Sequence, residues 1–126
     1  MSSSMNFLKQ RSSEFYEMSR RSLQEGKYAM CAFCAEQAFQ FELKYFIGSR
    51  LGDFPKTHGL IVLLQESSKL CPALQEFSER NTTAISHLED AYIMSRYYDK
   101  EYREEEVKEM LNLYDELASK LGECPK

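Results

Sequence analysis

Residues Tyr28–Arg50, with the sequence YAMCAFCAEQAFQFELKYFIGSR, form the stretch that decides the fold. Apolar residues stand at most positions around the circumference of a helix drawn through this stretch. A helix that is apolar on almost every side has to be covered by other elements. Its polar residues Glu36, Gln40 and Lys44 follow one another at intervals of four, which places them on one face. We therefore expect this stretch to be the central helix of the fold.

Helical periodicity continues on both sides of the central stretch. Further helices are expected over residues 5–25, 58–70, 72–97 and 103–121. Gly26 ends the first of them, and residues 48–56 form the clearest loop. With only five glycines and three prolines, the chain has few places for the tight turns of a many-stranded β fold. The sequence predicts an all-α, antiparallel up-and-down bundle of four to five helices that forms a single domain over residues 1–126.

Length and composition exclude several classes of protein. The 126 residues are 43% hydrophobic and 29% charged, which excludes a disordered chain. No apolar run approaches the roughly 18 residues of a membrane span, and residues 1–5 lack the basic and apolar regions of a signal peptide. A net charge of −4 argues against a protein that coats nucleic acid non-specifically, but it allows a local basic pocket. We expect a cytoplasmic protein that makes no membrane contact.

The four cysteines are not arranged as a zinc site. Cys31 and Cys34 form a CxxC pair inside the apolar helical pattern, without a second pair or a nearby histidine to complete a metal-ligand set. We expect both to be small core residues. Cys71 and Cys124 stand alone, each next to a proline, and the sequence leaves open whether any of the four forms a disulfide. We expect no metal and no cofactor.

Each of the two histidines allows two interpretations. His87 follows Arg80 by seven positions, so the two lie near one face of the helix expected over residues 72–97. An Arg–His pair suits phosphodiester cleavage, because arginine stabilises the charge of the phosphorane and histidine transfers a proton. In the alternative interpretation, Arg80 and His87 are surface residues on a solvated helix face. His58 stands at a helix start, where it either bonds a loop or a helix end, or takes part in ligand binding.

The sequence Arg96-Tyr97-Tyr98 joins a cation and two aromatic rings at the end of the same expected helix. Such a group can stack a base and bind a phosphate. In the alternative account, the tyrosines pack under the following loop while Arg96 pairs with Glu101 or Glu104. Arg96 and Tyr97 are therefore candidate ligand-binding residues.

Three segments of the chain share motifs with one protein family. Residues 32–38 (AFCAEQA), followed by 42–44 (ELK), are similar to a family helix of the pattern A-x-x-A-E/Q-Q-A-x-E-x-x-L-K. Residues 57–60 (THGL), with the leucines at 63 and 64, are similar to T/S-H-D/N-L-x-x-L-L. Residues 91–97 (AYIMSRY) are similar to A-Y-x-x-S/A-R-Y-P. On these segments, which stand in the same order and cover most of the chain, the protein resembles the HEPN family.

The resemblance implies a four- or five-helix bundle that commonly pairs as a homodimer. Many relatives are encoded beside a minimal nucleotidyltransferase and act as a toxin, often a metal-independent ribonuclease, or as a nucleotide- or RNA-binding partner. In active ribonucleases of the family, an arginine and a histidine four to six residues apart line a cleft at the dimer interface. Here no histidine follows Arg96 at that spacing, Tyr98 replaces the family's proline, and Gly59 replaces an aspartate or asparagine. These departures favour a member without ribonuclease activity.

The leading hypothesis is a HEPN-like module, related to toxin–antitoxin systems, that does not catalyse a reaction itself. It binds a nucleotide, an RNA or a nucleotidyltransferase partner. Lys44 and Arg96 would contact phosphate, Tyr97 would stack or hydrogen-bond, and His58 would complete the ligand-binding set.

Two other hypotheses remain open. In the first, the protein is a metal-independent endoribonuclease in which Arg80 or Arg96 stabilises charge and His87 or His58 is the acid or base. In the second, it is a structural module used only for homodimerisation. The helix over residues 28–50 supports this second alternative, because it offers more apolar surface than a few flanking helices can cover.

Overall fold

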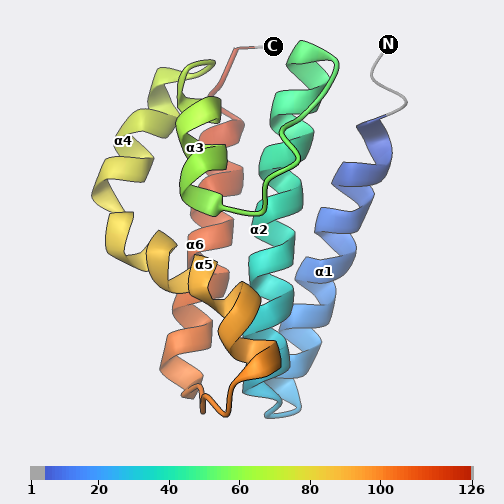
Figure 1. Ribbon diagram of the computed structural model, residues 1–126, viewed down its shortest axis with the longest axis vertical. Helices are drawn as coiled ribbons and strands as arrows, with labels where there is room; N and C mark the ends of the chain where they lie inside the picture. Colours follow the sequence, from blue (N-terminus) through green and yellow to red (C-terminus); the bar gives the residue numbers. More distant parts are fainter. Residues whose placement is uncertain (1–4, 126) are drawn as a thin grey trace.

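The computed structural model describes residues 5–125, and over this range the chain forms six α-helices and no strand. The helices are α1 (Asn6–Gln24), α2 (Tyr28–Leu51), α3 (Leu60–Ser68), α4 (Pro72–Arg80), α5 (Thr82–Tyr97) and α6 (Glu104–Leu121). Figure 1 shows the chain descending along α1, rising along α2, descending through α4 and α5, and rising along α6. The prediction of an all-α up-and-down bundle is confirmed. No helix within the described range combines the length and the apolar character that crossing a bilayer requires.

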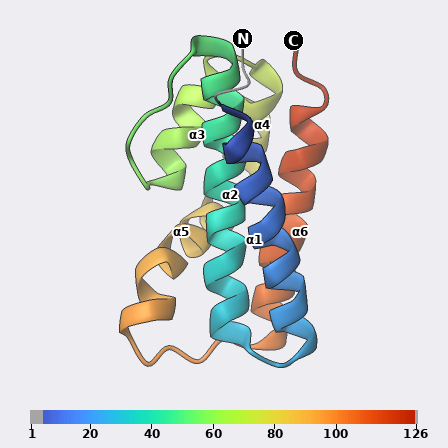
Figure 2. The same cartoon turned by 90° about the vertical axis from the view of Figure 1, so that its right-hand side faces the viewer.

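The helix α2 is the centre of the bundle, as its sequence predicts. It packs against α1, α3, α5 and α6, and the ring of its Phe39 stacks on that of Phe77 in α4, with centroids 6.4 Å apart. Figure 2 shows α3 and α5 on one side of α2, with α1 and α6 on the other. Leu43 and Ile47 of α2 are also buried. Each fully buried side chain of this size contributes about 1.5–3 kcal/mol, so packing around α2 supplies much of the stabilisation.

The single helix predicted over residues 72–97 is in fact two helices, because Asn81 separates α4 from α5. The Asn81 side-chain nitrogen donates to the carbonyl oxygen of Phe77 at 3.0 Å. The hydroxyl of Thr82 likewise donates to the carbonyl oxygen of Ser78 at 3.0 Å. Such bonds to the preceding turn compete with the backbone ladder and bend or end helices. The chain therefore curves between α4 and α5 (Figure 1), which leaves Arg80 and His87 on different helices.

Two other predicted boundaries shift by a few residues. The loop predicted over residues 48–56 begins only at Gly52, whose φ of +86° lies in the left-handed region that favours glycine and so ends α2. The helix predicted from residue 58 begins at Leu60. Its start is fixed by Glu89 of α5, whose carboxylate accepts the backbone N–H of Ile61 at 2.9 Å. A carboxylate at this end of a helix satisfies an amide that has no intrahelical partner.

A buried polar cluster fastens α1 and α6 to α2. The carboxylate of Glu42 is buried, and its Oε1 lies 2.8 Å from the Ser12 hydroxyl and 3.1 Å from the Tyr114 hydroxyl. Lys9 of α1 forms an ion pair with the same carboxylate at 2.9 Å. A buried carboxylate without partners is costly. These contacts therefore fix how the three long helices align.

One pair of cysteines is bonded and the other is not. Cys71, at the start of α4, forms a disulfide with Cys124, which follows α6. Cys31 and Cys34 are buried, unpaired core residues, as predicted. Burial raises the pKa of both thiols, that of Cys34 to about 11. At neutral pH neither is a reactive thiolate.

We expect reduction of the Cys71–Cys124 bond to lower the free energy of unfolding by about 4 kcal/mol, because the bond closes a long loop in the unfolded chain. The two cysteines are separated by 53 residues. Urea titrations with and without dithiothreitol measure this loss in the free energy of unfolding. The same loss is expected in a reducing cytoplasm, where disulfides are rare. The variant Cys71→Ala/Cys124→Ala is the control, because its midpoint should not respond to the reductant. An equal midpoint for the wild-type protein under both conditions would show that the bond does not stabilise the fold.

Candidate functional site

The polar face of α2 is a continuous hydrogen-bonded row made of Glu36, Gln40 and Lys44, which we call the α2 polar row. The Gln40 amide nitrogen donates to Glu36 Oε2 at 2.9 Å, and Lys44 Nζ donates to Gln40 Oε1 at 3.0 Å. All three side chains are buried. The prediction that these three residues share one face of the helix is confirmed. That face points into the protein.

His58 connects the α2 polar row to α5. Its Nδ1 lies 3.1 Å from Gln40 Oε1, the atom that also accepts Lys44. Because the Gln40 amide nitrogen is directed to Glu36, the atom facing His58 is an acceptor, and Nδ1 carries the hydrogen. The His58 ring stacks on Tyr92 of α5, with centroids 4.9 Å apart and planes at 20°. This arrangement leaves Nε2 of His58 as the ring nitrogen available to a ligand.

Glu36 is an ionisable group that is entirely out of contact with solvent. Gln37 donates to its Oε1 at 2.7 Å, in addition to the bond from Gln40 to Oε2. Burial raises the pKa of Glu36 to about 7, and the hydrogen bonds from Gln37 and Gln40 and the charges of Arg96 and Lys44 oppose this rise only in part. The α2 polar row therefore changes its charge close to neutral pH.

Lys44, one of the residues predicted to contact phosphate, has a side chain that is largely enclosed. Its residue is 6% exposed, and Nζ lies 5.9 Å and 5.8 Å from the ring centroids of Phe41 and Phe54. Burial lowers the pKa of this amine, although the charge of Glu36 partly opposes the effect. Its observed contact is the hydrogen bond that orients the Gln40 amide.

Arg96 and Tyr97 are the exposed members of the Arg96 cluster, which also contains the half-buried Phe33 and Tyr92. The guanidinium carbon of Arg96 lies 4.4 Å from the ring centroid of Tyr92, 4.8 Å from that of Tyr97 and 5.3 Å from that of Phe33. Arg96 Nε donates to the carbonyl oxygen of Tyr92 at 2.7 Å. Within residues 5–125, no carboxylate forms an ion pair with Arg96, so the alternative pairing with Glu101 or Glu104 is not observed.

Arg80 and His87 border one cavity of about 480 Å³ between α4 and α5, but each has its own carboxylate. Arg80 forms ion pairs with Glu116 and Glu76. His87 Nε2 lies 3.1 Å from Glu106. In the part of the chain that the structure describes, no group of three or more His, Cys, Asp or Glu side chains is placed to hold a metal ion.

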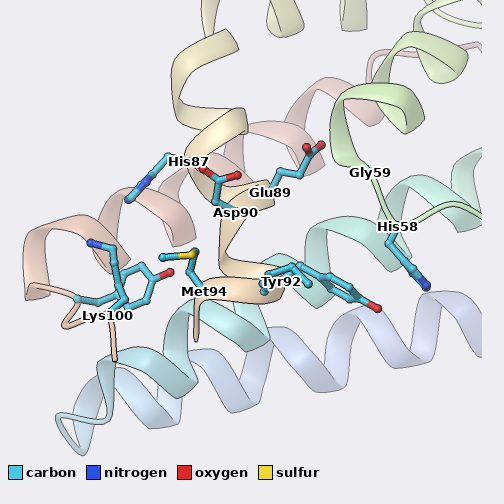
Figure 3. A pocket seen from close by; sticks show the side chains of 10 residues that line it. His58, Gly59, His87, Glu89, Asp90, Tyr92, Met94 and Lys100 are labelled. Carbon is cyan, nitrogen blue, oxygen red and sulfur yellow. The ribbon is translucent and has the colours of Figure 1, made fainter. Parts of the chain in front are cut away.

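A second and larger cavity, the α5 pocket, lies along α5 and has a volume of about 530 Å³. Figure 3 shows His58 and Tyr92 at one end of it, Glu89 and Asp90 in the middle, and His87 and Lys100 at the other end. The pocket therefore combines aromatic walls with carboxylates and cations, a composition found in small-molecule sites.

Comparison with known proteins agrees with this architecture. The family model for the HEPN domain matches residues 5–123. The chain belongs to the HEPN domain family. The crystal structure of TT1696 from Thermus thermophilus is similar to this HEPN domain, with a TM-score of 0.80 and 23% sequence identity over 94% of this chain and 96% of that chain. This likeness shows the fold alone, and no curated protein matches the chain.

The three motif segments of this HEPN domain meet at His58. The first segment supplies the α2 polar row, the second supplies His58 itself, and the third supplies Tyr92 and Arg96 from α5. Hydrogen bonding of His58 to Gln40 and stacking on Tyr92 join all three. Of the sequence-predicted site residues, the structure thus brings Lys44, His58 and Arg96 into one neighbourhood.

Sequence reasoning missed the other side of the α5 pocket. Glu89, Asp90, Lys100 and Tyr102 all line it. The charged residues gave no motif, and Tyr102 lies in the connection between α5 and α6, where its burial could not be read from periodicity. The one available signal was the dense charge of residues 89–90 and 99–101 close to the Arg-Tyr motif.

We expect the variant Glu36→Gln to remove a pH dependence of stability. Because folding raises the pKa of Glu36, its contribution to stability is fully present below the unfolded pKa and is lost as the pH rises through about 7. The free energy of unfolding of the variant minus that of wild type should therefore rise by about 2–3 kcal/mol from pH 5 to pH 8.

Urea titrations at the two pH values measure this difference. The control is Glu17→Gln, which removes one carboxylate from an exposed position on α1. Parallel pH profiles for wild type and Glu36→Gln would contradict a buried carboxyl that titrates near neutral pH.

Proposed function

We propose that this HEPN domain is a binding module for a nucleotide or an RNA strand, and that it holds the phosphate with Arg96 without catalysing a reaction. The observation that carries the proposal is the state of the Arg96 guanidinium. It is positioned by three aromatic rings and by one bond from Nε, and no carboxylate within residues 5–125 forms an ion pair with it, although its charge acts on the buried Glu36.

The surroundings of Arg96 fit the chemistry of a nucleotide. Its terminal nitrogens remain available for the bidentate contact that guanidinium makes with phosphate. Tyr97 is 68% exposed, so its ring can stack on a further base of a bound RNA strand. Stacking of this kind is worth about 1–3 kcal/mol per base and tolerates any base. The same arrangement explains why a protein with a net charge of −4 could still bind a polyanion at one place.

The geometry favours binding over ribonuclease activity. Arg80 and His87 come nearest to the spacing of a catalytic Arg–His set, and both are engaged by carboxylates that offset positive charge. A transition state of phosphodiester cleavage requires uncompensated positive charge. Arg96 forms no ion pair within residues 5–125, but no histidine follows it at the spacing of a catalytic Arg–His set.

The wider role that we propose follows the family resemblance. Relatives commonly form homodimers and work beside a minimal nucleotidyltransferase in toxin–antitoxin systems. Exposed apolar side chains at Ile93, Tyr97 and Tyr98 near the end of α5 provide surface for a second copy or for that partner. We propose the cytoplasm as the compartment, since nucleotides and RNA are found there.

Isothermal titration with AMP, ATP and a short single-stranded RNA tests the proposal. We expect Arg96→Ala to weaken binding about tenfold to a hundredfold, the range of one lost hydrogen bond to a charged group. The matched control is Arg80→Ala, which removes an arginine that carboxylates already neutralise and should leave affinity unchanged. Absence of heat with all three ligands would overturn the proposal.

A metal-free cleavage assay on a mixed RNA pool tests the non-catalytic part. We expect the wild-type protein to leave the RNA intact at concentrations where light scattering shows its final oligomeric state. Cleavage that Arg96→Ala, or Arg80→Ala combined with His87→Ala, abolishes would establish the endoribonuclease instead and would locate its cation.

A further inference from the structure

The α5 pocket holds a hydroxyl group that has no partner within the protein. Tyr102 is 6% exposed and lines the pocket, and within residues 5–125 nothing hydrogen-bonds its hydroxyl. Lys100 Nζ lies 4.6 Å from the centroid of its ring and helps to fix it. Burial raises the pKa of Tyr102, and the charges of Glu106 and Asp90 add to the rise, so the hydroxyl keeps its proton. The hydroxyl is therefore a protonated group on the lining of the pocket that a ligand there can reach.

Around this hydroxyl, the cationic side chains are paired with a carboxylate, whereas two other carboxylates can still accept hydrogen bonds. Lys100 and His87 both contact Glu106, at 3.3 Å and 3.1 Å. Glu89 uses one carboxylate oxygen for a backbone amide of α3. Within the described range, Asp90 has no hydrogen-bond or ion-pair partner. A ligand in the pocket therefore meets mainly acceptors, which attract N–H groups and repel a phosphate.

The walls and the location of the pocket suit a flat ring next to a phosphate site. Tyr92, stacked on His58, forms one wall, and Ile93 and Met94 add apolar surface. A volume of about 530 Å³ lies within the range of small-ligand sites. The Tyr92 ring is also 4.4 Å from the Arg96 guanidinium carbon. A nucleotide whose phosphate lies on Arg96 therefore has its base within reach of the pocket.

We infer that the α5 pocket receives the base of the bound nucleotide and selects bases with an exocyclic amino group, with Asp90 and Tyr102 as the recognising residues. The inference rests on the proposed function, which supplies the phosphate contact. Adenine, guanine and cytosine each carry an exocyclic amino group, and cytosine has its amino group at the position where uracil has a carbonyl oxygen. A carboxylate that faces a carbonyl oxygen stays unsatisfied, and sites built to hydrogen-bond a donor discriminate on this basis.

Isothermal titration with AMP, GMP, CMP and UMP tests this selection. We expect the three amino-bearing nucleotides to bind about tenfold more tightly than UMP. Asp90→Asn should bring all four affinities to within about twofold of one another while leaving that of UMP unchanged. Tyr102→Phe should weaken the amino-bearing nucleotides about threefold, as expected for one neutral hydrogen bond.

Two substitutions outside the pocket are matched controls for these variants. Asp99→Asn removes the same charge from an exposed position, and Tyr45→Phe removes the same hydroxyl from a half-buried position on α2. Both should keep the wild-type preference. Loss of the preference in the controls as well would overturn the assignment to Asp90 and Tyr102.

The phosphate site and the base pocket can be separated with nucleosides. Equal binding of the four nucleotides, abolished by Arg96→Ala, would overturn the base pocket and leave the proposed function intact. Binding of cytidine and guanosine that Asp90→Asn abolishes would support the pocket even if the nucleotides fail to bind. No heat with either nucleotides or nucleosides would overturn both.

Discussion

The burial of most of α2 is the constraint on which the rest of the structure depends. Only a stripe through Phe33, Gln37, Phe41 and Tyr45 is half-buried in its middle part. The polar side chains away from this stripe have no solvent face and need a partner inside the protein. Glu42 is satisfied by α1 and α6, through Ser12, Lys9 and Tyr114. The α2 polar row is satisfied within itself and by His58. The same packing that builds the core thus determines where the other helices lie along α2.

The α2 polar row also positions the exposed part of the site. Gln40 holds His58, His58 stacks on Tyr92, and Tyr92 accepts the bond that fixes Arg96. This chain of contacts leads from a buried carboxyl to an exposed guanidinium in few steps. A surface arginine ordinarily loses rotamer freedom when it binds, and one that is already held by rings and by a backbone carbonyl loses less. The interior of the bundle therefore prepares a surface site.

Particular residues show how far sequence reasoning reached. The period of four in Glu36, Gln40 and Lys44 gave their common face, because helical geometry alone fixes it. The break at Asn81 was missed although asparagine and threonine at this point carried a signal, since their side chains bond the preceding turn only when that turn exists. The Cys71–Cys124 bond could not be predicted, because the bond depends on where α6 ends relative to α4.

Fold class, the central helix and the family motifs all follow from local periodicity and short-range spacing. These patterns are present in the sequence regardless of which helices later pack together. The pairing of distant side chains does not, because it depends on how helices lie beside one another. Tertiary structure alone paired Arg80 with Glu116 and left Arg96 without an ion pair among the described residues, although both are arginines at the end of a helix. It also brought Glu89 to the start of α3 and enclosed Tyr102 beside Asp90. Spacing in the sequence places residues on a face, whereas burial and charge compensation come from the elements packed against that face.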